Sequence, residues 1–191
     1  MKNSRLVNLI REIIAIDDTD MVLMENFFES VCCEKGQLLE VENKPTKYLY
    51  FINSGFIRIF YNEEGSQITT HINCPSGFIS SFNSFINGTN STDNIECITS
   101  CEVLRITKSN LDLLCQESQK WADFARITYE QSVIYNEQRT KDIINLSAEE
   151  RYLKLLKDNT DIIQNVPLQY IASFIGIKPE SLSRIRKKLI S

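Results

Sequence analysis

The sequence predicts an α+β protein with three parts: an N-terminal antiparallel β-roll of the jelly-roll type with flanking helices, a long connecting helix, and a C-terminal all-α helix-turn-helix domain. Three observations support this prediction. Short β-type apolar runs punctuated by glycines fill residues 36–107, apolar residues at helical spacing fill residues 108–144, and two short amphipathic segments lie within residues 167–191. With 191 residues, of which 42% are hydrophobic, the chain is long enough for two domains.

The first 30 residues are predicted to be helical. Their apolar residues recur at intervals of three and four, which forms two stripes: Leu6, Leu9, Ile10, Ile13 and Ile14, then Met21, Met24, Phe27 and Phe28. Acidic residues come early in this segment and no small-residue cleavage site follows, so we expect no secretory signal. No stretch approaches the roughly 20 apolar residues of a membrane span. We therefore expect a cytoplasmic protein that does not bind a membrane.

The β-roll is predicted from six short runs that are rich in β-branched and aromatic residues: QLLEV, KYLYFI, GFIRIFY, QITTHI, NIECIT and CEVLRI. Glycines lie between or beside these runs, where turns are expected, at Gly36, Gly55, Gly65 and Gly77. Short runs with regular turns are typical of a compact antiparallel roll or barrel.

A long helical stretch follows from about Lys108 to Ile144. So long a helix has an apolar face that one chain does not cover, and we expect a second copy to cover it, which gives a homodimer. The alternative is a helix packed wholly on its own roll.

A further helix, AEERYLKLLKD, is predicted to begin after Ser147, because Glu150 lies three residues later and completes a capping box. We place the domain boundary near Asn145, which divides the chain into residues 1–144 and residues 145–191.

The two C-terminal amphipathic segments form the predicted helix-turn-helix. Apolar residues share one face of each segment, with Ala172 at the closest approach of the two helices. Gly176 is expected to take a positive φ in the turn. Pro179 and Glu180 suit the first turn of the second helix, since proline lacks only an amide that is unpaired there and the carboxylate complements the helix dipole.

The second of these helices leaves a polar and basic face for a partner. A helix with this face fits the major groove of double-stranded DNA, where arginine contacts guanine and glutamate accepts from cytosine. We therefore take Glu180, Ser181 and Arg184 as base-reading candidates and Lys187 and Lys188 as phosphate contacts. The full set of candidate DNA-binding residues is Lys178, Glu180, Ser181, Ser183, Arg184, Lys187 and Lys188. An ordinary helical hairpin with a solvated basic face is the alternative.

The charge distribution agrees with a basic DNA-reading segment on an acidic body. The net charge of the whole chain is -4. From Asn145 onward, eight Lys or Arg residues and five acids give +3, so the first 144 residues carry -7.

Other chemistries find little support in the sequence. His71 is the only histidine, whereas metal-dependent β-roll enzymes usually need two or three, and no nucleophile motif or phosphate-binding glycine loop occurs. We expect no enzymatic activity, no catalytic residues, no metal and no cofactor. The six cysteines are expected to be reduced thiols. Cys97 and Cys101 flank a short turn, which leaves redox sensing open beside unreactive burial.

Taken together, these parts resemble the CRP/FNR superfamily of bacterial transcription regulators. The segments GFIRIFYNEEGSQITTHINCPSGF and IASFIGIKPESLSRIRKKL carry the resemblance. It implies a cyclic-nucleotide-binding-like sensor domain with the dimerisation helix in residues 1–144, and a DNA-binding domain lacking an evident wing in residues 145–191. By this resemblance, Glu180, Ser181 and Arg184 fall on base-contacting positions, whereas Pro179 departs from the arginine that many relatives carry there.

This sequence departs from the typical members of the family at the nucleotide site. Typical members place a glutamate shortly after a Gly-Phe turn and an arginine some ten residues later; here Ser81 and Ser91 stand near those positions. Residues 59–104 contain no Lys or Arg, so a bound phosphate has no cationic partner there. We predict that cyclic AMP is not bound in the usual way.

Some other small-molecule effector, of unknown identity, remains open, because backbone amides around Ser80 and Ser81 can cradle a ligand. The candidate ligand-binding residues are Gly77, Phe78, Ser80, Ser81, Ser91 and Thr92. The alternative to a transcription regulator is a non-enzymatic small-molecule or protein-binding module whose helix-turn-helix is only structural.

Overall fold

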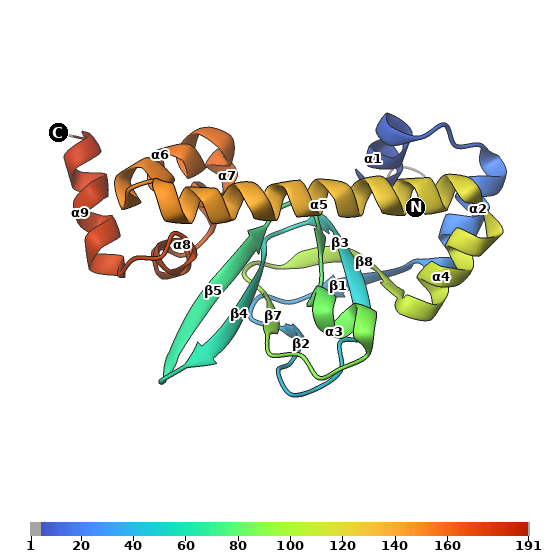
Figure 1. The fold of residues 1–191 in the computed structure, drawn as a ribbon, viewed down its shortest axis with the longest axis horizontal. Helices are drawn as coiled ribbons and strands as arrows, with labels where there is room; N and C mark the ends of the chain where they lie inside the picture. The colour runs from blue at the N-terminus through green and yellow to red at the C-terminus, as the bar shows by residue number, and fades with distance from the viewer. Residues whose placement is uncertain (1–4, 191) are drawn as a thin grey trace.

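The computed structural model describes residues 5–190 and confirms the predicted fold class. Figure 1 shows a β-roll beneath one long helix, α5, with N-terminal helices at one end of that helix and a cluster of C-terminal helices at the other. Among the described residues, no helix combines the length and apolar character needed to cross a bilayer.

The roll consists, within residues 5–190, of two antiparallel sheets with the strand orders β1-β8-β3-β6 and β2-β7-β4-β5. The strands are β1 Glu29–Cys33, β2 Leu38–Glu40, β3 Tyr48–Ser54, β4 Ile57–Glu63, β5 Ser66–Asn73, β6 Phe78–Ile79, β7 Asn94–Cys97 and β8 Cys101–Thr107. Alternating side chains of both sheets meet in a core that includes Ile52, Ile57, Ile95 and Val103, each fully buried. The six predicted runs all contain strand residues, and β1 and the short β6 add to them.

The helices within residues 5–145 lie before, between and after these strands in the chain. They are α1 Arg5–Ile13, α2 Asp18–Phe27, α3 Phe82–Asn87, α4 Lys108–Glu117 and α5 Gln119–Asn145. Trp121 and Phe124 of α5 pack with Phe51 and Leu104 of the roll and with Leu6 of α1 in a second core. This core fixes the first part of α5 on the roll.

The long helix predicted from Lys108 to Ile144 is interrupted at Ser118. Its backbone is extended, with φ −146° and ψ 121°, and it ends α4 and starts α5. The Ser118 hydroxyl donates to Asp20 of α2 at 3.3 Å, and Lys120 pairs with the same carboxylate at 2.6 Å. Because these contacts join segments about 100 residues apart, local periodicity could not reveal the break.

The remaining helices are α6 Ala148–Asp158, α7 Thr160–Asn165, α8 Leu168–Phe174 and α9 Pro179–Ile190. The predicted capping box of α6 is present, since Ser147 and Glu150 exchange side-chain to backbone hydrogen bonds. The hydrophobic core formed by α6, α7, α8 and α9 also includes Phe56, Ile72 and Ile98 of the roll. The C-terminal helices are therefore packed on the roll as well as joined to it by α5.

His71 of β5 links the roll to the middle of α5. Its Nε2 lies 3.0 Å from Oδ1 of Asn136, and burial lowers the pKa of its imidazole because the charged form loses solvation. Since His71 is the only histidine, an NMR titration of its ring reports this site alone, and we expect a pKa below the ordinary value.

The pKa of His71 is lower in the folded protein than in the unfolded chain, where it is about 6.5. The contribution of His71 to the free energy of unfolding is therefore complete above pH 6.5 and decreases as the pH falls through the folded pKa. His71→Gln is expected to remove that part of the pH dependence. A titration at or above 6.5 would contradict the prediction.

Candidate nucleic-acid interface

The two helices α8 and α9 form a tight pair around a glycine turn, as predicted. Ala172 is fully buried where they approach, and the amide of Ile177 donates to the Ala172 carbonyl at 2.9 Å. Gly176 has φ +76°, a conformation that costs a residue with a Cβ about 1–2 kcal/mol. Leu182 of α9 is fully buried against α8, which fixes the rotation of α9 about its own axis.

Arg151 of α6 supports this turn from the side. Its Nε donates to the carbonyl of Ile175 at 2.9 Å, and Nη1 donates to the carbonyls of Leu146 and Ile143. One guanidinium thus joins the end of α5, the start of α6 and the turn before α9. Sequence reasoning missed this role, because nothing in the local pattern distinguishes Arg151 from a solvated helix residue.

The exposed face of α9 brings most of the predicted DNA-binding residues together. At about 100° per residue, an arc of roughly 120° centred on Arg184 contains Glu180, Ser181, Arg184, Lys187 and Lys188. All are exposed except the half-buried Ser181, which accepts a hydrogen bond from Arg184 at 3.2 Å. Ser183 lies beside the arc and Lys178 precedes the helix, so these two are set apart from the main face.

Lys188 has a partner within the domain. Its ammonium lies 2.8 Å from the Glu149 carboxylate of α6, while the lysine side chain remains 70% exposed. An exposed pair of this kind contributes little to stability and can exchange its carboxylate for a phosphate. Arg186 is exposed too, but it lies on the opposite side of α9 from Arg184.

Two of the six candidate ligand-binding residues, Ser81 and Ser91, form a cluster with Asp93, and the other four are not hydrogen-bonded to it through their side chains. Ser81 donates to the Asp93 carboxylate at 3.0 Å, and the Ser91 hydroxyl lies 2.9 Å from that of Ser81 and accepts from the Asp93 amide. Ser80 is buried and donates instead to the carbonyl of Tyr48. The structure thus joins Ser81 and Ser91 around a negatively charged side chain.

The other three candidates lie outside this hydrogen-bonded cluster. Phe78 packs edge-on against Phe51 and Phe124, with ring centroids 5.1 and 6.2 Å away, and belongs to the apolar core under α5. Gly77 lies in the turn before β6, where its amide donates to the Cys74 carbonyl at 3.2 Å. Thr92 is exposed.

Three cysteines lie together in the roll core. Cys33 and Cys101 are partners in the register of β1 and β8, and Cys97 is buried with them. A hydrogen bond from Cys97 lowers the pKa of the Cys101 thiol, whereas burial raises the pKa of Cys33. Each residue is at most 5% exposed, so an oxidant has little access, which favours a structural role over redox sensing.

Comparison with known proteins finds the same fold in several solved structures. Residues 31–118 match the family of cyclic nucleotide-binding domains. FixK2 from Bradyrhizobium japonicum has a similar structure, with 16% identity, a TM-score of 0.72, and coverage of 85% of this chain and 84% of FixK2. Among curated proteins, the sequence has no significant match.

Two further solved structures have a fold similar to that of this chain. The c-di-GMP responsive global regulator CLP from Xanthomonas campestris is 19% identical with a TM-score of 0.66, covering 91% of this chain and 92% of CLP. A protein from Eubacterium rectale assigned to the crp/fnr family of transcriptional regulators is 16% identical with a TM-score of 0.69, covering 92% of this chain and 84% of its own. The predicted resemblance to the CRP/FNR superfamily is confirmed at the level of the fold.

Proposed function

We propose that this protein is a homodimeric transcription regulator of the CRP/FNR type, in which residues 1–144 form a sensor domain and residues 145–191 bind double-stranded DNA in the cytoplasm. The observation that carries the proposal is the polar arc centred on Arg184: it is exposed on a helix whose opposite side is fixed by Ala172, Leu182 and the Gly176 turn. A rigid helix presenting arginine and glutamate side by side suits reading of the major groove.

Selection of binding sequences from a random duplex pool tests the proposal. We expect enrichment of a two-fold-symmetric site with half-sites about one helical turn apart, and an affinity that decreases steeply with salt as phosphate contacts release counterions. Absence of enrichment at low salt would support the alternative, a binding module with a structural helix-turn-helix.

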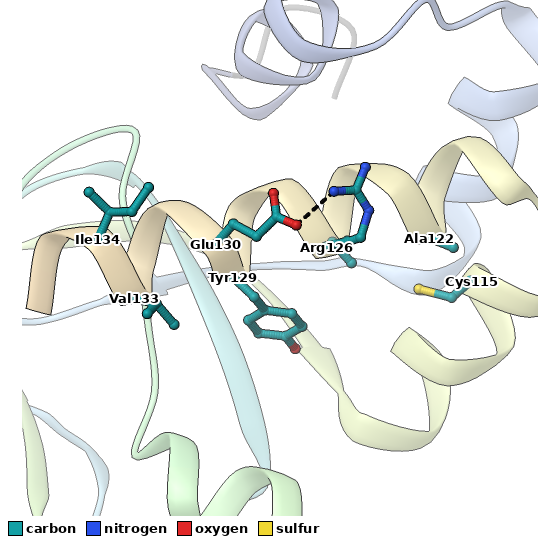
Figure 2. Close-up of a pocket in the computed structure, with 8 residues that line it drawn as sticks. Cys115, Ala122, Arg126, Tyr129, Glu130, Val133 and Ile134 are labelled. Carbon is teal, nitrogen blue, oxygen red and sulfur yellow. Dashed lines mark hydrogen bonds and ion pairs between the residues drawn. The ribbon is translucent and has the colours of Figure 1, made fainter. Parts of the chain in front are cut away.

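The dimer is proposed from the outer face of α5. Ala122, Ala125, Tyr129, Val133 and Ile134 line an open, shallow groove along this helix, with Cys115 of α4 at one end. Figure 2 shows Arg126 and Glu130 on the same helix, where they form an ion pair at 2.7 Å. Val133 is 67% and Ile134 58% exposed in the single chain. Arg126 and Glu130 line the same groove, so a second copy of α5 would cover the apolar side chains and meet this compensated pair as well.

The sensor is proposed not to bind cyclic AMP in the usual way. The Asp93 carboxylate holds the hydroxyl of Ser81, which has Ser91 as its other neighbour, so a phosphate placed there would meet a negative charge. We expect calorimetry to show no saturable binding of cyclic AMP at micromolar concentrations. Tight binding that weakens in Ser81→Ala or Ser91→Ala would overturn this expectation.

A further inference from the structure

Arg58 is a buried cation at the contact between the roll and the helix-turn-helix domain. It lies on β4 and is 1% exposed. Its Nε donates to the carboxylate of Glu96 on β7 at 2.7 Å, and its other nitrogens donate to the side chains of Gln67 and Thr69 on β5. With its charge compensated and each of its three nitrogens donating, the guanidinium is held in the plane that these partners define.

Two aromatic rings, one from the roll and one from the C-terminal helices, stack with this guanidinium. The Phe60 ring of β4 lies 4.0 Å from the guanidinium carbon, and the Tyr170 ring of α8 lies 3.6 Å from it. A stack in which an arginine is desolvated between rings is stronger than an exposed one. The roll thus provides the cation and one ring, and the first helix of the helix-turn-helix provides the other ring.

A second contact lies next to the stack. Ser173 of α8 accepts a hydrogen bond from the backbone amide of Thr69 at 2.8 Å. β5 is an edge strand of its sheet, so the Ser173 hydroxyl accepts from a backbone amide that has no neighbouring strand to donate to. Arg139 of α5 adds a third contact by lying 3.9 Å over the Phe174 ring and donating to the Phe174 carbonyl. Figure 1 shows α8 beside β5 and below the end of α5.

These contacts leave the DNA-reading arc open. Tyr170 and Ser173 are on α8, whereas Glu180 and Arg184 are exposed on α9. The contact between roll and α8 therefore fixes the orientation of the helix pair without covering the surface proposed to meet DNA.

We propose that Arg58 and Tyr170 are positioning residues for DNA recognition: their stack sets the orientation of α8, and through the Gly176 turn that of α9, relative to the dimer helix. The proposal rests on the proposed function. In a dimer, two reading helices already held at the half-site spacing lose less freedom on binding than two loosely tethered ones. The stack thus favours binding to two half-sites at once.

Hydrogen exchange tests the contact without DNA. Tyr170→Leu removes the ring but leaves Arg58 and its ion pair in place, and we expect faster exchange of the Thr69 amide and of α8. Tyr170→Phe keeps the ring and is expected to exchange like the wild type. Tyr48→Leu is the matched control, because Tyr48 stacks with Arg105 at 4.3 Å within the roll. Equal protection of Thr69 in the Leu and Phe variants would overturn the proposal.

Affinities for full and half sites test the positioning role. For Tyr170→Leu we expect roughly tenfold weaker binding to a two-fold duplex and little change for a single half-site, because only the two-headed complex needs the fixed orientation. Tyr170→Phe should restore the full-site affinity. Equal losses on both duplexes would mean that the helix pair itself is damaged, and unchanged affinity for both would mean that the stack does not position it; either result overturns the proposal.

A wild-type protein that binds no duplex would overturn the proposed function, and the positioning role with it. The exchange result would still decide whether the stack holds the two domains together, so the two failures are distinguishable.

Discussion

Arg184→Ala is expected to lower the affinity for the selected two-fold duplex by at least about tenfold and to remove the preference for one base pair in each half-site. A bidentate arginine contact to guanine contributes about 1–3 kcal/mol of discrimination, and a dimer loses two such contacts. Arg184 is exposed and, within residues 5–190, its side chain hydrogen-bonds only to Ser181, so its truncation should leave the fold unchanged. Repeating the selection with the variant, together with thermal unfolding, checks both points.

Lys187→Ala is the comparison variant. Lys187 lies at the edge of the same arc, one turn nearer the C-terminus, where phosphate contact is expected. Its loss should weaken binding about equally for all sequences and reduce the salt dependence, with the selected sequence unchanged. If both variants lowered affinity alike and neither changed the selected sequence, Arg184 would be a phosphate contact and the assignment of base reading to this residue would be wrong.

The helix-turn-helix was predictable because local spacing determines it. Ala172 and Leu182 occur at intervals that place them on facing sides of two helices, and Gly176 supplies the one backbone conformation that the turn requires. The same period places Glu180 and Arg184 on the free side of α9. For this segment the residues that build the fold and those that form the candidate site belong to one pattern.

The contact between the roll and the C-terminal helices was not predictable from spacing. Arg58 sits in an apolar strand run, and its partners Glu96 and Tyr170 lie 38 and 112 positions away in the chain. Phe56 and Ile72 were expected as residues of the roll, but they pack against the C-terminal helices. Periodicity reports which side of an element is buried; it does not report which element covers it.

Val133→Glu is expected to convert the proposed dimer to a monomer and, as a result, to abolish tight binding to the full two-fold duplex. In a symmetric pair of α5 helices, each chain would bring a new glutamate to the groove, where Arg126 is already paired with Glu130. Burying a carboxylate without a partner costs at least about 3 kcal/mol, a factor of about 100 in the dissociation constant. The single chain should tolerate the change, because Val133 is 67% exposed.

Val22→Glu is the matched control for this prediction, since Val22 is 56% exposed but lies on α2, outside the groove. Sedimentation velocity at micromolar concentration should find Val22→Glu dimeric and Val133→Glu monomeric, with both variants folded. The monomer should retain weak affinity for a half-site, because each reading helix is held by its own roll and its own turn. A dimeric Val133→Glu would place the subunit interface elsewhere, and the spacing of the two reading helices would then have to be set by a surface other than α5.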